Sequence, residues 1–322
     1  MVTGTDSMAR LAAVDIGTNT VRLLVSDVFA DGTKTDVVRR AIITRLGQGL
    51  GESGMFKPEA VVRTLETLAA YSDEIRELGV EAVKVVATSA ARDAGNSGEF
   101  LEAAGNILGT VVAVVSGETE ASFAFLGATF DFPFENPDNP VVVFDVGGGS
   151  TEVISGRGRT MEHAVSLDIG SVRLTELFVR NDPPTGVEVA KIQERARVEI
   201  EEGLERLAPV VKDSVVIGVA GTVTTIKAVD LELSPYDSAK VHLSVLTGAE
   251  VDRVLMKFLM LPLAERLELP GLEPKRADVI IAGTIITEVV LDALGASGLT
   301  VSEHDIIDGT LLTLARTLAS DK

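Results

Sequence analysis

The sequence predicts an α/β protein built from two similar lobes. Its 322 residues are enough for two domains of ordinary size, each with its own core. Apolar runs typical of buried strands alternate with segments of helical periodicity. A short motif, in which a strand is followed by aspartate, an apolar residue, glycine and a hydroxyl residue, occurs twice, at 15–20 and at 145–150. The internal repeat is the observation that most strongly favours two related lobes.

Taken in order, the first half of the chain alternates strands and helices. Asp31-Gly32 is a typical hairpin turn, and Pro58 stands where a first-turn proline would begin a helix. The predicted strands are 11–14, 21–28, 34–43, 83–87 and 111–115, and the predicted helices are 58–79, 99–108 and 118–126.

The second half begins after 131–140, which has three prolines in ten residues and is the best candidate for a linker. The predicted strands are 141–144, 153–155, 164–167 and 215–219, and the predicted helices begin near 171, 187, 220, 277 and 310. We therefore expect a first lobe at 1–130, a second lobe at 131–308, and a final helix, about 309–322, that packs back on the first lobe.

The second copy of the motif, Asp145 to Glu152, predicts a site for a metal ion and a phosphate. Glycines without a Cβ let several backbone N–H groups approach one anion, and the carboxylates of Asp145 and Glu152 suit a hard cation such as Mg²⁺. The candidate phosphate contacts here are Gly147, Gly148, Gly149 and Ser150.

The first copy follows the strand 11–14 and supplies Asp15 as a third candidate metal ligand. Two unrelated turns could also place glycine after a strand, but they would not be expected to share the aspartate, the hydroxyl and the flanking strands. We interpret the pair as two lobes that face each other across a cleft. The candidate phosphate contacts of this copy are Gly17, Thr18, Asn19 and Thr20.

Two further segments, 87–96 (ATSAARDAGN) and 116–121 (SGETEA), complete a set of four motifs in order. With them the chain, from about Arg10 to about Leu318, resembles the exopolyphosphatase and guanosine pentaphosphate phosphohydrolase family. That family belongs to the actin, sugar kinase and heat-shock ATPase superfamily. The resemblance implies two actin-like lobes of the ribonuclease H-like type, dependence on Mg²⁺ or Mn²⁺, and a dimer as a common assembly.

The resemblance also implies a catalytic base. The family's catalytic glutamate precedes an alanine, which matches Glu120, with Glu118 as the second choice. By position alone, a glutamate in the first turn of a helix could equally be there to complement the helix dipole. Hydrolysis needs a carboxylate that accepts a proton from the attacking water, and this need favours Glu120.

Several cationic and hydroxyl residues are candidate substrate contacts. Thr88 and Ser89 offer hydroxyls at a strand end, and the planar guanidinium of Arg92 suits bidentate contact with phosphate. Glycine and threonine at a helix start favour anions. The remaining candidates from the matching segments are Arg22, Arg173, Gly221, Thr222 and Arg276, with Lys227 as a weaker one; Arg173 could equally be a surface arginine of a helix.

Composition narrows the possible partners and location. There is no cysteine, the first residues lack the features of a secretory signal, and the longest apolar stretch, 277–294, contains three acidic residues. A cytoplasmic location is expected. A net charge of −19 argues against nucleic acid or anionic membrane as partner, and a polyanionic substrate would need bound cations to offset it.

The three histidines show no ligand spacing, and structural or surface roles are expected for them. The glycine-rich loop 47–51 is either a mobile flap or an ordinary surface loop.

The expected activity is release of orthophosphate from the end of inorganic polyphosphate, with removal of the 5′-terminal phosphate of guanosine pentaphosphate as the alternative. Longer family members have additional C-terminal domains, and this sequence ends at Lys322. We therefore expect a preference for short chains. A kinase of the same superfamily and a noncatalytic polyphosphate or nucleotide sensor remain as other classes.

Overall fold

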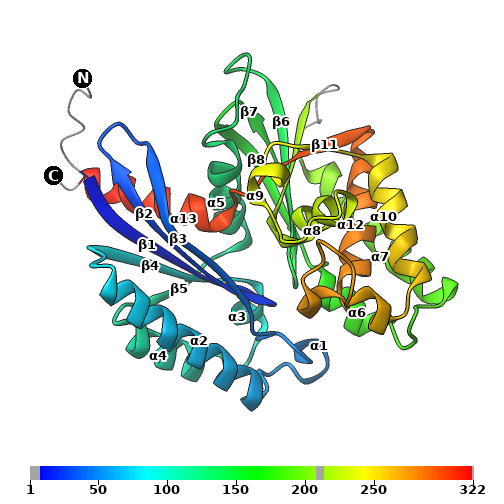
Figure 1. The fold of residues 1–322 in the computed structure, drawn as a ribbon, viewed down its shortest axis with the longest axis horizontal. Helices are drawn as coiled ribbons and strands as arrows, with labels where there is room; N and C mark the ends of the chain where they lie inside the picture. The colour runs from blue at the N-terminus through cyan, green and yellow to red at the C-terminus, as the bar shows by residue number, and fades with distance from the viewer. Residues whose placement is uncertain (1–7, 208–213, 321–322) are drawn as a thin grey trace. The chain divides into compact units, whose positions relative to one another are not determined.

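The computed structural model describes residues 8–207 and 214–320. Contacts divide the chain into two units, Met1–Ser116 with Ile306–Lys322, and Gly117–Asp305 (Figure 1). The sequence predicted instead that the first lobe ends at residue 130 and that the second lobe runs from 131 to 308. The difference arises because the helix α5 (Gly117–Thr129) packs on strands of the second sheet, so the proline-rich stretch 131–140 lies inside the second unit.

The first unit contains a five-stranded sheet in the order β3-β2-β1-β4-β5. Strands β1 to β3 are antiparallel, and β4 and β5 continue the sheet in parallel with β1. The strands are β1 (Met8–Ile16), β2 (Thr20–Phe29), β3 (Lys34–Ile43), β4 (Ala82–Ala87) and β5 (Val112–Val114). The helices are α1 (Leu50–Ser53), α2 (Pro58–Glu77), α3 (Ser89–Asp93), α4 (Ser97–Leu108) and α13 (Ile306–Ser320).

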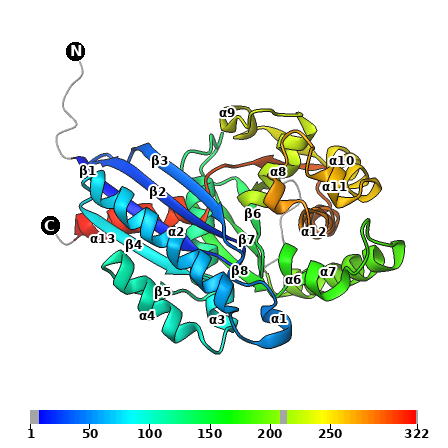
Figure 2. The ribbon, with the colours of Figure 1, turned by 60° about the horizontal axis from the view of Figure 1, so that its bottom comes forward.

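Strand β1 is buried on both faces because its alternate side chains enter two different cores. Ala12 and Val14 belong to the cluster formed with α2 and α4, whereas Leu11 and Ala13 pack against Leu311 and its neighbours on α13. Figures 1 and 2 show α2 and α4 running along the sheet, and α13, in red, is the C-terminal helix that covers β1.

The second unit contains a six-stranded sheet in the order β10-β11-β9-β6-β7-β8. The strands are β6 (Pro140–Val146), β7 (Thr151–Arg157), β8 (Thr160–Leu167), β9 (Val215–Val219), β10 (Val245–Thr247) and β11 (Gly298–Val301). Besides α5, the helices are α6 (Ser171–Phe178), α7 (Gly186–Arg206), α8 (Ala220–Asp230), α9 (Ser238–Val241), α10 (Gly248–Met260), α11 (Leu263–Arg266), the 3₁₀ helix η1 (Pro274–Arg276) and α12 (Ile280–Leu294).

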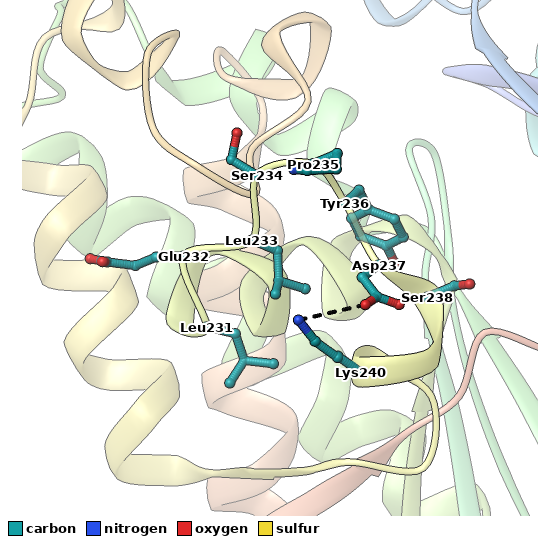
Figure 3. A pocket seen from close by; sticks show the side chains of 9 residues that line it. All are labelled: Leu231, Glu232, Leu233, Ser234, Pro235, Tyr236, Asp237, Ser238 and Lys240. Atoms are coloured by element: carbon teal, nitrogen blue, oxygen red, sulfur yellow. Dashed lines mark ion pairs between the residues drawn. The ribbon is translucent and has the colours of Figure 1, made fainter.

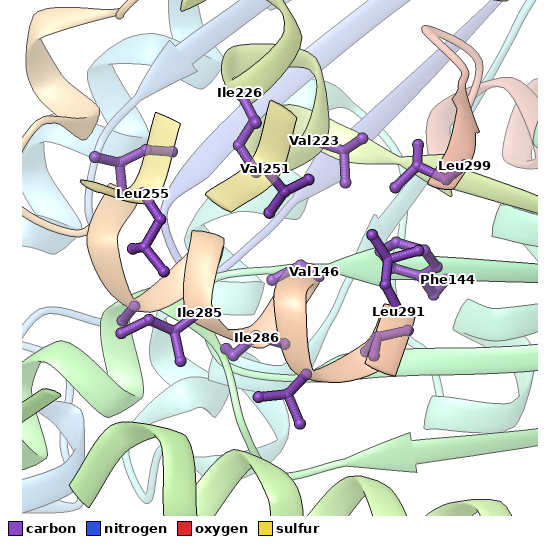
Figure 4. Close-up of a cluster of buried hydrophobic side chains, with 14 of the residues drawn as sticks. Phe144, Val146, Val223, Ile226, Val251, Leu255, Ile285, Ile286, Leu291 and Leu299 are labelled. Carbon is purple, nitrogen blue, oxygen red and sulfur yellow. The ribbon is translucent and has the colours of Figure 1, made fainter. Parts of the chain in front are cut away.

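Strand β6 separates two apolar clusters in the same way. Val141 and Val143 face the cluster that includes α5, while Val142 and Phe144 face the larger cluster. Figure 4 shows the larger cluster, in which Phe144 and Val146 of β6 lie among side chains of α8, α10, α12 and β11. Because α12 is buried almost all round, the apolar stretch noted in the sequence is a core helix. No helix in the described parts of the chain is long and apolar enough to cross a membrane.

The two sheets share one topology. Three antiparallel strands, β1-β2-β3 in one unit and β6-β7-β8 in the other, are followed in each sheet by a strand parallel to the first, β4 or β9. The predicted α/β class with two related sheets is confirmed. In each unit the motif found in the sequence is the turn between the first two strands.

Candidate functional site

The second glycine turn joins β6 to β7 and is closed by a hydrogen bond from the Gly147 N–H to the Ser150 carbonyl, at 3.0 Å. The start of α6 packs directly beneath it. A Cβ on Gly170, the residue before α6, would lie 2.4 Å from the Gly148 carbonyl oxygen, so only glycine allows this approach.

The carbonyls of this turn are held by α6. The Ser171 N–H donates to Gly147 O at 2.9 Å, and Arg173 Nε donates to Gly149 O at 2.7 Å. By contrast, no acceptor among the described residues takes up the N–H groups of Gly148 and Gly149. The turn therefore offers backbone donors to an anion, and Arg173 supports the turn from the side of its carbonyls.

Two carboxylates and a hydroxyl lie in a row across this sheet. Asp145 on β6 is paired with Glu152 on β7, and Glu152 is paired with Ser166 on β8. Directly opposed residues of antiparallel strands point to the same face. Ser166 Oγ donates to Glu152 Oε1 at 2.7 Å, and the side chain of Glu152 is almost completely buried, with 1% exposed.

Glu120, in the first turn of α5, is the third member of this group. The start of α5 lies against β8, because a Cβ on Gly117 would be 2.5 Å from the Cβ of Ser166. Burial raises the pKa of Glu152 well above its usual range, and the nearby charges of Glu120 and Asp145 raise it further. The three carboxylates therefore form one buried cluster next to the glycine turn.

The donor set of this cluster fits a divalent cation. Three carboxylates taken out of water repel one another, and either a proton or a bound cation has to offset their charge. Carboxylate oxygens are the ligands that Mg²⁺ and Mn²⁺ prefer. Asp145 and Glu152, paired on adjacent strands, could supply oxygen ligands to such an ion.

The first turn repeats this geometry with one difference. The Gly17 N–H donates to the Thr20 carbonyl at 3.0 Å, and Asp15 on β1 is paired with Arg22 on β2, as Asp145 is with Glu152. Arg22 Nη1 lies 3.8 Å from Asp15 Oδ2. In the first unit the paired position is therefore a cation, which offsets the charge of the aspartate.

The loop 44–47 holds the carbonyls of the first turn. The Thr44 N–H donates to Asn19 O at 3.1 Å, and the Gly47 N–H donates to Thr18 O at 2.9 Å. The glycine-rich segment, predicted as either a flap or a surface loop, thus begins as a buried support of the turn. The side-chain oxygen and nitrogen of Asn19 and the hydroxyl of Thr44 are buried without a hydrogen-bond partner in the described structure. Such atoms are rare in proteins and indicate a bound water or ligand.

Thr88, Ser89 and Arg92 lie at the same end of the strands as the first turn. Strand β4 is parallel to β1, and the Thr88 N–H donates to the Ile16 carbonyl at 3.2 Å. Arg92 Nη1 donates to the Val115 carbonyl at 2.9 Å, which fixes the guanidinium at the end of β5.

Gly221 and Arg276 are brought together in the second unit. A Cβ on Gly221 would be 2.2 Å from Arg276 Nη2, so the guanidinium lies directly on the first turn of α8. Thr222 Oγ1 donates to the Val146 carbonyl at 2.9 Å, and this bond ties α8 to the strand that carries Asp145. Ala220, where α8 begins, has the left-handed φ of 66°, which non-glycine residues seldom adopt.

Within each unit, then, most of the predicted residues lie at the same end of the strands of the sheet. Lys227 is the exception, because its ammonium is occupied by Asp230 at 3.0 Å and Glu250 at 3.6 Å. Residues that the sequence reasoning did not single out are Ser166, which holds Glu152, and Thr44 beside the first turn. Ser166 could have been found only from the strand register.

A cavity of about 510 Å³ in the second unit lies apart from these residues (Figure 3). Its lining comes from the segment between α8 and α9 and from α9 itself, and none of the three clustered carboxylates belongs to it. Lys240 and Asp237 form an ion pair at its wall. The lining residues are Leu231, Glu232, Leu233, Ser234, Pro235, Tyr236, Asp237, Ser238 and Lys240.

Residues 25–317 match the model of the Ppx/GppA phosphatase family, and the chain belongs to this family. The resemblance inferred from the four motifs is confirmed. Membership indicates a divalent-metal-dependent hydrolase of phosphoric anhydrides.

Among curated relatives, exopolyphosphatase 2 of Mycobacterium tuberculosis is 39% identical over 321 residues, which cover 96% of this chain and 99% of that protein. A solved structure of an exopolyphosphatase-like protein is 34% identical, with a TM-score of 0.92, and the match covers 97% of this chain and 99% of that one. The Aquifex aeolicus member of the Ppx/GppA family is 35% identical, with a TM-score of 0.80, and the match covers 98% of this chain and all of that one.

Proposed function

We propose that the protein is an exopolyphosphatase that hydrolyses the terminal phosphate of inorganic polyphosphate and releases orthophosphate. The observation that carries the proposal is the buried cluster of Glu120, Asp145 and Glu152 beside a glycine turn with available backbone donors. The exopolyphosphatase 2 of M. tuberculosis, similar over nearly its whole length, supports the choice of substrate.

In this proposal the phosphate oxygens are bound by backbone N–H groups of the turns at 17–20 and 147–150. Asp145 and Glu152 would hold Mg²⁺, with Asp15 as a further ligand, and the bound ion would offset charge on the phosphoryl oxygens. Because Arg22 lies 3.8 Å from Asp15, a cation at Asp15 would compete with Arg22. In the second turn the residue paired with Asp145 is another carboxylate, Glu152, and two adjacent carboxylates favour this turn as the source of the main ligands.

Glu120 is assigned to the attacking water. Its carboxylate would take a proton from water while the water oxygen forms a bond to the terminal phosphorus and the bridging P–O bond breaks. Positioned proton transfer of this kind contributes roughly 100 to 10,000-fold to a rate. Arg92 and Arg276 are the cations proposed to bind phosphates of the substrate, and Thr88, Ser89, Gly221 and Thr222 are the proposed neighbours of those contacts.

The test is orthophosphate release, with Mg²⁺ and with EDTA, from short polyphosphate, long polyphosphate, guanosine pentaphosphate and ATP at equal concentrations of terminal groups. We expect Mg²⁺-dependent release from polyphosphate that exceeds release from ATP. Faster release from guanosine pentaphosphate would reassign the substrate. Binding of polyphosphate without any release, by folded protein, would contradict the proposal and identify a sensor.

A further inference from the structure

Asp131, His242 and His304 meet at one end of the second sheet, although they are far apart in the sequence. Asp131 follows α5, His242 follows α9 and His304 follows β11. His242 Nε2 lies 3.2 Å from Asp131 Oδ2, and His304 Nδ1 lies 3.1 Å from Asp131 Oδ1. The two imidazole rings are 4.7 Å apart between centroids. The mechanism proposed above uses none of these residues.

We propose that these three residues form a second metal site, distinct from the carboxylate cluster, which binds Zn²⁺ or a similar borderline cation. Two imidazole nitrogens and one carboxylate oxygen are typical zinc ligands, whereas Mg²⁺ prefers oxygen alone. One atom from each residue can be chosen so that all three lie within 4.8 Å of one another. In a tetrahedral site with Zn–N and Zn–O bonds of about 2.0 to 2.1 Å, neighbouring ligand atoms are about 3.3 Å apart. The observed distances of 3.2 and 3.1 Å end on different oxygens of Asp131, so a bound ion requires a small rotation of the carboxylate or contact with both of its oxygens.

The site is accessible and its ligands are held in place. The exposed fractions of the side chains are 35% for Asp131, 21% for His242 and 19% for His304, so an ion can enter from solvent. Each oxygen of Asp131 lies within hydrogen-bonding distance of one imidazole, and these contacts orient the carboxylate toward the two rings. Ser302 fixes the backbone on both sides of His304, since its hydroxyl accepts from the His304 N–H and donates to the His304 carbonyl.

Existing hydrogen bonds of the two imidazoles oppose binding. The Glu303 N–H donates to His242 Nδ1 at 3.2 Å, which places the proton of the neutral ring on Nε2, the nitrogen that would bind the metal. A bound cation requires the proton of His304 Nδ1, which donates to Asp131, to move to Nε2. It also requires the His242 proton to move to Nδ1 and the Glu303 contact to be lost. One neutral hydrogen bond corresponds to about tenfold or less in a binding constant, so it weakens the site without preventing binding.

The site is too far from the proposed base to share an ion with it. Glu120 lies near the start of α5 and Asp131 follows its end, and a helical rise of 1.5 Å over the nine steps from Glu120 to Thr129, the last residue of α5, gives roughly 13.5 Å. A cation there would join three connecting segments of the second unit. Its expected effect is on stability.

The test uses the full chain, freed of metal and kept in excess Mg²⁺ so that the carboxylate cluster is saturated. Co²⁺ is added first and the visible absorption is recorded, because Co²⁺ in a tetrahedral site with nitrogen ligands absorbs much more strongly than hydrated Co²⁺. Zn²⁺ is then titrated by competition. We expect one Co²⁺ per chain with tetrahedral bands, displacement by Zn²⁺, and a melting temperature several degrees higher with Zn²⁺.

His242→Ala and His304→Ala test the ligands, and His163→Ala, an exposed histidine on β8, is the matched control. The first two are expected to weaken Zn²⁺ binding by more than the roughly 10 to 100-fold that follows loss of a residue that only orients a ligand. The control should bind like the parent protein. Circular dichroism in EDTA establishes that each variant is folded.

Absence of tetrahedral Co²⁺ bands in the parent protein would overturn the proposal whatever the variants do. Equal Zn²⁺ binding by the parent and by folded His242→Ala and His304→Ala would also overturn it, since the ion would then reside elsewhere. The proposal would also be overturned if His163→Ala weakened Zn²⁺ binding as much as His242→Ala and His304→Ala do.

Discussion

Replacing Glu152 by glutamine tests whether the carboxylates of the cluster repel one another when no metal is bound. The amide has nearly the same shape and can still accept the hydrogen bond from Ser166, so the change mainly removes a charge. Directly opposed residues such as Glu152 and Asp145 have Cβ atoms about 5 Å apart. Two charges at that distance with an effective dielectric constant of about 20 repel each other by about 3 kcal/mol.

The effect on stability depends on pH, and its sign follows from the raised pKa of Glu152. A carboxyl group whose pKa is higher in the folded state binds protons more tightly there, so its contribution to the free energy of unfolding falls as pH rises above the unfolded pKa, about 4.5. At pH 8 without metal, Glu152→Gln is expected to be more stable than the parent by about 1 to 3 kcal/mol. The difference should shrink as pH is lowered toward 5, and Mg²⁺ should stabilise the parent more than the variant.

Urea unfolding in EDTA and in Mg²⁺, at several pH values, measures these differences. Glu162→Gln on the neighbouring strand β8 is the control, because its half-exposed carboxylate has only a surface ion pair with Arg157, at 3.5 Å. A metal-free Glu152→Gln protein that is less stable than the parent at pH 8, or a difference that does not change with pH, would refute the reasoning.

The remaining predictions concern turnover. Glu120→Gln is expected to lower kcat by roughly 100 to 10,000-fold while the affinity for polyphosphate changes little. The control is Glu118→Gln, at the neighbouring acidic position, which should retain most activity. Comparable losses of kcat in both variants would remove the specific role of Glu120. Gly47→Ala would place a Cβ 2.4 Å from Thr18 Cγ2, and we expect steady-state assays to show a raised KM through displacement of the first turn. Gly51→Ala, where a Cβ meets nothing within 4 Å, is its control, and equal KM values for the two would show that the turn tolerates the shift.

Local motifs predicted the positions of the two turns because each turn is encoded by adjacent residues. Strand, aspartate, glycine and hydroxyl follow one another without a gap, and the structure places both copies between antiparallel strands closed by the same hydrogen bond, at 3.0 Å. The α/β class and the topology shared by the two sheets follow from the same repeat.

The partners of these residues across the sheet could not be predicted in this way. Ser166 faces Glu152 only because of the β7–β8 register, and a bulge between Ser155 and Gly156 shifts that register, so counting from the hairpin turn gives the wrong pairing. Likewise Asp131 and His242 are 111 residues apart in sequence, and no local spacing indicates their contact. The boundary between the two units was also hidden, because α5 packs on the strands of the second sheet although it precedes the proline-rich stretch.

The difference between the two turns argues for distinct roles within a repeated structure. At equivalent positions opposite the aspartate, the first unit has Arg22 and the second has Glu152. The same backbone therefore places a cation opposite the aspartate in one unit and a second carboxylate opposite it in the other. A polyanionic substrate would be repelled by the second arrangement unless a divalent ion were present. On the proposed function, the second turn therefore supplies the main metal ligands, and Asp15 of the first turn is a weaker ligand because Arg22 already lies beside it.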